Sequence, residues 1–274
     1  MKKSVILIFL SIFVSCKITS NKNDFIKLEN NISEIKDNES FQKEILTADT
    51  NYDAIIVNQG SCFGECPINS TYLNRNGEFY FRSTEYNSLP YGLYTSLIDI
   101  NETNKIFNLF DKLDFNTLND KYTTYQEDIS TDFITFIKDG KIVKTIESEM
   151  SCPLDLRKAY SELSNLYEIS NLKKKSDSNF KGSIMTCTFN DSIFLEDSEI
   201  YFLEILLEKG NKGNFNFIKK YNLDFFTWGE NNVESVVSDG RYYQIKYLDN
   251  TSVTIDIGHN FVENNPIIKQ KKIE

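Results

Sequence analysis

Alternating apolar and polar positions in the first half of the chain predict strands that pair as hairpins. Asn76-Gly77 and Asp139-Gly140 each lie between two alternating segments. Such dipeptides are strong hairpin signals, because both residues tolerate the positive φ of a tight turn. The predicted strands span residues 54–57, 70–73, 78–82, 94–97, 132–137 and 142–146.

Apolar residues recur at helical spacing in three segments, each of which predicts an amphipathic helix. In the first, Ile106, Phe110 and Leu113 share one face, and Asn101 is the expected N-cap. Pro153 marks the expected start of the second. The predicted helices span residues 101–113, 153–166 and 199–207. Strands followed by a helix, twice over, indicate an α+β fold with helices packed on a largely antiparallel sheet built from hairpins.

A polar run over residues 173–179, followed by Gly182, suggests a domain boundary. We expect one α+β domain over 52–172 and, over 183–274, a smaller α+β unit or an extension packed on the first. Strands are predicted in this second part at 232–237, 242–247 and 252–257, while the aromatic-rich segment 215–228 receives no element.

The first residues have the pattern of an export signal. Lys2 and Lys3 precede an apolar stretch over residues 5–14 that is too short to span a bilayer. Residues 13–16 resemble the bacterial lipobox, which implies cleavage before Cys16 and lipidation of that cysteine. The alternative is an ordinary secretory signal that happens to contain a cysteine.

Lipidation would divide the N-terminal region into a signal peptide, 1–15, and a lipidated cysteine with a tether, 16–51. The membrane is then a partner through the anchor on Cys16, and the location is the bacterial cell envelope. Lys17 follows the cysteine where Asp would indicate inner-membrane retention, so we expect the outer membrane. The formal net charge of −10 disfavours nucleic acid as a partner.

Cys62 and Cys66 form the most distinctive chemical feature of the chain, four positions apart in a turn between Gly60 and Pro67. In an oxidising compartment the leading interpretation is a short structural disulfide, with Gly64 supplying the backbone freedom of the small ring. Two other interpretations stay open. One is a redox-active pair; the other is a copper site completed by the single histidine, His259. Cys152 and Cys187 are further possible partners.

The cysteine turn also carries a resemblance to a family. Residues 53–168 resemble an uncharacterised domain family of exported and lipid-anchored bacterial proteins, with a Cys-Phe-Gly-x-Cys-Pro signature, and no activity is implied. Asn69 and Ser130 depart from its usual Tyr and Pro. The matching residues are Cys62, Phe63, Gly64, Cys66, Pro67, Gly77, Tyr122, Asp128 and Gly140.

No catalytic set stands out in the sequence. One histidine makes a Ser/His/Asp triad improbable, and no glycine-rich phosphate loop or cofactor motif occurs. Two carboxylate pairs could serve as acid and base, and an aromatic run could face a sugar or peptide. These residues are Glu127, Asp128, Glu147, Glu149, Phe225, Phe226 and Trp228.

We therefore expect an envelope lipoprotein with a binding or structural role toward a protein, peptide or glycan, and no cofactor. The competing hypothesis is an envelope enzyme, or a metal or thiol-redox protein, that uses Cys62 and Cys66.

Overall fold

The computed structural model describes residues 50–124, 129–149, 151–190, 192–265 and 267–268. The expected signal peptide, Cys16 and all but the last two residues of the tether lie outside them, as do Glu127 and Asp128. In the described part no helix is both long and apolar enough to cross a membrane.

The first sheet comes from residues 54–174 and is antiparallel except where β5 runs parallel to β7. It contains both predicted hairpins, β2–β3 and β6–β7. In spatial order its strands are β5 (Lys121–Tyr122), β7 (Lys141–Ser148), β6 (Asp132–Lys138), β1 (Ala54–Gln59), β2 (Ile68–Asn74), β3 (Glu78–Glu85), β4 (Gly92–Leu97) and β8 (Lys173–Lys174).

The second sheet comes from the rest of the chain, and its strand pairs are all antiparallel. In spatial order its strands are β10 (Ile193–Phe194), β9 (Ser183–Phe189), β12 (Tyr221–Trp228), β13 (Val233–Ser238), β14 (Tyr242–Tyr247), β15 (Ser252–Asp256) and β11 (Asn211–Gly213).

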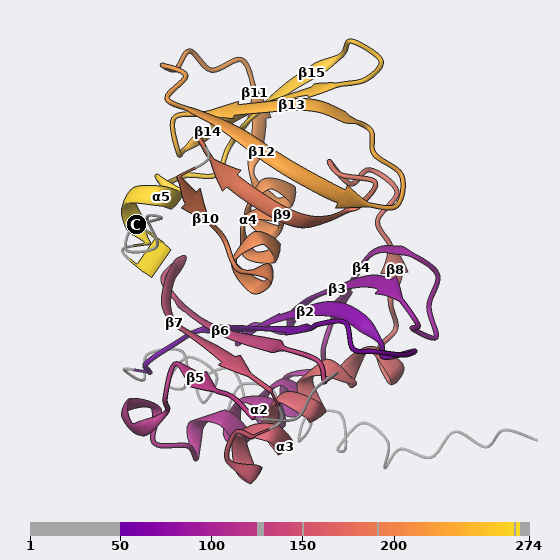
Figure 1. The fold of residues 1–274 in the computed structure, drawn as a ribbon, viewed down its shortest axis with the longest axis vertical. Helices are drawn as coiled ribbons and strands as arrows, with labels where there is room; N and C mark the ends of the chain where they lie inside the picture. Colours follow the sequence, from indigo (N-terminus) through magenta and orange to yellow (C-terminus); the bar gives the residue numbers. More distant parts are fainter. Residues whose placement is uncertain (1–49, 125–128, 150, 191, 266, 269–274) are drawn as a thin grey trace, which may run out of the picture. The chain divides into compact units, whose positions relative to one another are not determined.

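Two helices, α2 and α3, cover one face of the first sheet (Figure 1). Alternation along the strands explains why this face is apolar: Ile55 and Val57 of β1 join Phe81 and Phe136 in a core with both helices, whereas Ile56 belongs to the other face. The helical elements are α2 (Ile100–Asp111), η1 (Phe115–Thr117), α3 (Leu154–Ser164), η2 (Leu166–Glu168), α4 (Asp197–Lys209) and α5 (Phe261–Asn264).

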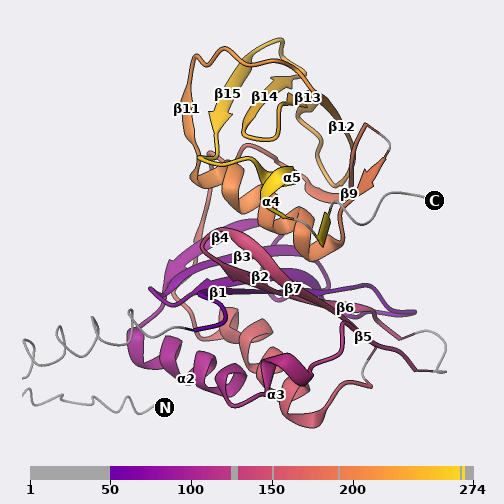
Figure 2. The same cartoon turned by 90° about the vertical axis from the view of Figure 1, so that its left-hand side faces the viewer.

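Helix α4 lies between the two sheets (Figure 2). It packs against β9 on one side and against β1, β2 and β6 on the other. Its residues are buried nearly all round, which is the pattern of a helix enclosed on both sides. The second half of the chain is thus packed on the first through one shared apolar cluster, which includes Ile56, Ile137, Phe189 and Phe202.

The face of the first sheet that meets α4 changes character along its strands. On this face, the next residue along β1 after Ile56 is Asn58, and the next along β3 after Tyr80 is Arg82. Arg82 is 1% exposed and forms an ion pair with Glu204 of α4, which is 2% exposed. The sheet and helix therefore meet through apolar contacts at one end and buried polar groups at the other.

The sequence predicted the α+β class correctly, and strands outnumber helices in the described part of the fold. Several details were wrong. Asp99, not Asn101, caps α2, because its carboxylate accepts a hydrogen bond from the Asn101 backbone N–H at 2.9 Å. The strand expected at 94–97 begins earlier, since β4 starts at Gly92. Strands β9 and β12 were not predicted.

The Arg82–Glu204 pair yields a prediction about stability. In a Cys16→Ala background, Arg82→Met alone should lower the free energy of unfolding by about 3–5 kcal/mol, because it leaves the Glu204 carboxylate buried without a cation. Adding Glu204→Leu should restore most of the loss. Urea unfolding of the three proteins measures this. A single variant as stable as its parent would contradict the buried pair.

Candidate functional site

The cysteine turn connects β1 to β2 at one end of the first sheet. Cys62 and Cys66 lie at disulfide-bonding distance, with their Cα atoms 5.8 Å apart. Both are partly exposed, and Phe63 between them is 86% exposed. Pro67 leads into β2 rather than into a helix. No helix N-terminus follows the pair to lower a thiol pKa, so the geometry favours a staple over a redox centre.

The start of this turn is fixed to the neighbouring strand β6. The Gly60 N–H donates to the Asp132 carboxylate at 3.2 Å, and a Cβ at residue 60 would collide with the Thr131 carbonyl oxygen. Burial raises the pKa of Asp132, while hydrogen bonds from Gly60, Ser130 and Tyr160 oppose that rise. The turn is therefore anchored on a buried carboxyl group.

The remaining cysteines lie in separate cores. Cys152 is buried with α2 and α3, while Cys187 on β9 is buried on the other side of the first sheet. Burial raises the pKa of the Cys187 thiol to about 12. Both thiols are free, so among the described residues they form no second bridge.

His259 does not complete a site with the cysteines. Its ring lies 3.4 Å from the Cβ position of Gly140, at the β6–β7 turn. That turn adjoins the Ala54 end of β1, whereas the cysteine turn follows the Gln59 end. The described residues also contain no group of three His, Cys, Asp or Glu side chains placed to hold a metal. The structure does not bring together the copper ligands considered from the sequence.

Glu147 and Glu149, singled out from the sequence, both lie near Lys121. Glu147 forms an ion pair with Lys121 at 2.7 Å, while Glu149 accepts a hydrogen bond from the Thr124 N–H at 2.9 Å. On β12, Phe225 packs edge-on against Phe180, and the next residue, Phe226, is 60% exposed.

A small polar cavity lies beneath the cysteine turn, between β1, β2 and α4. Its volume is about 60 Å³. Asp197, Tyr201 and Glu204 share one face of α4 at helical spacing and line one side. Burial raises the pKa of Asp197 to about 6. The remaining lining residues are Asn58, Gly60, Ser61, Ile68, Asn69, Ser70, Thr84, Ser183 and Ile184.

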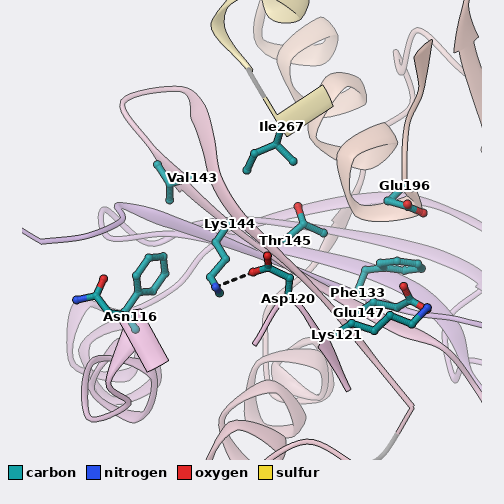
Figure 3. A pocket seen from close by; sticks show the side chains of 11 residues that line it. Asn116, Asp120, Lys121, Phe133, Val143, Lys144, Thr145, Glu147, Glu196 and Ile267 are labelled. Atoms are coloured by element: carbon teal, nitrogen blue, oxygen red, sulfur yellow. Dashed lines mark hydrogen bonds and ion pairs between the residues drawn. The ribbon is translucent and has the colours of Figure 1, made fainter. Parts of the chain in front are cut away.

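A larger pocket, of about 520 Å³, opens along β7 at the edge of the first sheet (Figure 3). Strand β5 pairs with the outer side of β7 only at Glu147 and Ser148. In the described chain, the outer side of residues 143–146 therefore has no strand partner. The pocket lies where this pairing stops.

Charged and apolar side chains alternate around that pocket. Lys144 contacts Asp120 at 2.7 Å, as Figure 3 shows, and its ammonium lies 5.9 Å from the centre of the Phe115 ring. The pair Lys121–Glu147 lies nearby. The lining residues are Phe115, Asn116, Asp120, Lys121, Phe133, Val143, Lys144, Thr145, Glu147, Glu196 and Ile267.

The sequence singled out only Glu147 among these pocket residues. The exposed edge of β7 could not be predicted from the sequence, because it exists only where the short strand β5 stops pairing with β7. For the polar cavity a signal was present: Asn58 and Arg82 interrupt apolar strand patterns at inward positions.

Comparison with known protein families gives a match to the part of the chain that forms most of the first sheet. Residues 53–167 match the family described as domain of unknown function (DUF6438), so a domain of this type is found there. Neither the curated proteins nor the solved structures contain a match to the chain.

The cysteine turn supports a stability prediction. Replacing both Cys62 and Cys66 with Ser should lower the free energy of unfolding by about 2 kcal/mol, because a five-residue ring removes little entropy from the unfolded chain. Urea unfolding of wild type with and without reductant provides the comparison, and reduced wild type should match the double variant. A variant as stable as the oxidised protein would show that the turn does not staple the fold.

Proposed function

We propose that this protein is a lipid-anchored protein of the bacterial cell envelope, attached through Cys16, whose folded part binds an extended peptide along β7. The observation that carries the binding role is the open pocket of about 520 Å³ beside the unpaired stretch of that strand.

Strand addition is the mode of binding that this edge supports. An unpaired strand edge offers backbone N–H and C=O groups to an incoming extended segment, and neighbouring pockets select its side chains. Val143 is 38% exposed on this edge. The Ile142 N–H already donates to the Asn265 side chain at 2.6 Å, so a ligand strand would begin its pairing after that residue.

The side chains around the edge favour a peptide with charges of both signs. Lys121 and Lys144 offer cations, and Asp120 and Glu147 offer carboxylates, all from β5, β7 and the residue before β5. Phe115 and Ile267 supply apolar surface for a ligand side chain. Aromatic and charged groups could also bind a glycan, which the experiment below separates.

The anchor has its own test. Cys16→Ala should move the protein from the membrane fraction to the soluble fraction of envelope extracts and abolish incorporation of labelled palmitate, because no acyl chain can then be attached. Cys152→Ala removes a buried thiol instead and serves as the matched control. Wild-type protein that takes up no palmitate would contradict lipid attachment.

The binding role is tested with a displayed library of random heptapeptides and an array of oligosaccharides. Wild type should select peptides, and a selected peptide should slow amide hydrogen exchange over residues 143–146. Val143→Glu should weaken its binding at least tenfold, because a charge on the edge opposes strand addition. Leu154→Glu changes an equally apolar residue, 68% exposed on α3, and should bind as wild type does.

Charge reversal refines this test. The double variant Lys121→Glu/Glu147→Lys keeps the ion pair but inverts its direction, so it should fold normally and select peptides of different charge order. Selection of oligosaccharides instead of peptides, or no protection of residues 143–146, would overturn strand addition.

A further inference from the structure

The polar cavity beneath the cysteine turn gathers buried oxygen atoms that have no hydrogen-bond partner. Asn58, Asn69 and Tyr201 all line it and are 8%, 1% and 3% exposed. Within the described residues, the Oδ1 atoms of both asparagines and the Tyr201 hydroxyl are unsatisfied. Buried polar groups are nearly always paired, so several such atoms around one cavity indicate an occupant.

The hydrogen bonds of the two amides leave oxygen atoms, not nitrogens, without a partner. The Asn58 Nδ2 atom donates to Ser70 Oγ at 2.9 Å. The Asn69 Nδ2 atom donates to the side-chain amide oxygens of Gln59 (Oε1) and Asn87 (Oδ1), at 2.8 and 2.9 Å. The amide groups around the cavity therefore present acceptors, and the occupant must be electropositive or donate hydrogen bonds.

The balance of charge also favours a positive occupant. Glu204 is neutralised by Arg82. Asp197 lies seven residues, or about two helical turns, before Glu204. It forms no ion pair or hydrogen bond with any residue the structure describes. The cavity thus holds one carboxylate without a countercharge beside neutral oxygen atoms.

We propose that this cavity binds a small monovalent cation, Na⁺ or K⁺, through oxygen atoms of Asp197, Asn58, Asn69 and Tyr201. Hard cations take carboxylate, amide and hydroxyl oxygens as ligands. About 60 Å³ accommodates such an ion with a few water molecules. A single uncompensated carboxylate matches one positive charge, and the ion would link α4 to the two strands that flank the cysteine turn.

Thermal unfolding at pH 7.5 and constant ionic strength tests the proposal on the Cys16→Ala protein. At this pH the Asp197 carboxyl is ionised, since its pKa is about 6. Tetramethylammonium replaces the ion to keep the ionic strength constant, because that cation is too large for the cavity. Once the site is saturated, the Tm should rise by about 3–5 °C for each tenfold increase in Na⁺ or K⁺. Whichever of Na⁺ and K⁺ acts at lower concentration is the preferred ion.

Two aspartates, each in the first turn of a helix, provide matched variants. Asp197→Asn removes the charge in the first turn of α4 and should abolish the dependence of Tm on the cation. Asp155→Asn removes an exposed charge in the first turn of α3 and should retain it. Tyr201→Phe should weaken the effect about tenfold by removing one oxygen ligand.

Crystals grown with Tl⁺ provide a direct view through anomalous scattering. A peak within the cavity supports the proposal. It is overturned by equal Tm values in all three salts, by loss of the effect in Asp155→Asn, or by a cavity that contains only water.

Discussion

The buried ion pair between Arg82 and Glu204 is the constraint around which the two halves of this protein are arranged. A guanidinium and a carboxylate that are removed from water tolerate little displacement, because the cost of their desolvation is recovered only while they remain in contact. Arg82 is fixed by β3 and Glu204 by α4. This contact determines where along the first sheet the helix can lie, and the second sheet is built on that helix.

The apolar contacts around the pair are less selective about position. Ile56 and Ile137 present smooth aliphatic surface to α4, and such surfaces can slide at modest cost. Hydrogen bonding adds a second fixed point, since Ser198 Oγ and Thr135 Oγ1 lie 2.7 Å apart. The interface therefore combines nonspecific burial, which supplies stability, with a few polar contacts that define one register.

The elements with a clear hydrophobic period could be predicted from the sequence. The β2–β3 and β6–β7 hairpins have Asn-Gly or Asp-Gly turns, and helices α2 and α3 each bury a single stripe. Strand β12 could not, because Phe226 is exposed and breaks the apolar–polar alternation that Leu223, Asp224 and Phe225 begin. Its neighbour β9 has Ser183, Thr186 and Thr188 among its seven residues, which weakens its apolar pattern.

The candidate sites were harder to predict than the elements. The cysteine turn was evident because its two thiols are close in sequence. The cavity and the pocket join residues from distant segments, so their existence depends on strand order and on the length of β5. Asn58 and Arg82 were the available signals, as polar residues within apolar strands.

The two faces of the first sheet are covered by different parts of the chain, and residues 53–167 supply the cover for only one of them. Helices α2 and α3 enclose only one face, and the other presents Ile56 and Ile137 beside a buried cation. On their own these residues would expose both an aliphatic patch and Arg82 without its carboxylate. In this chain the matched domain is therefore one part of a larger folding unit, and the second face of its sheet is covered by residues that follow it.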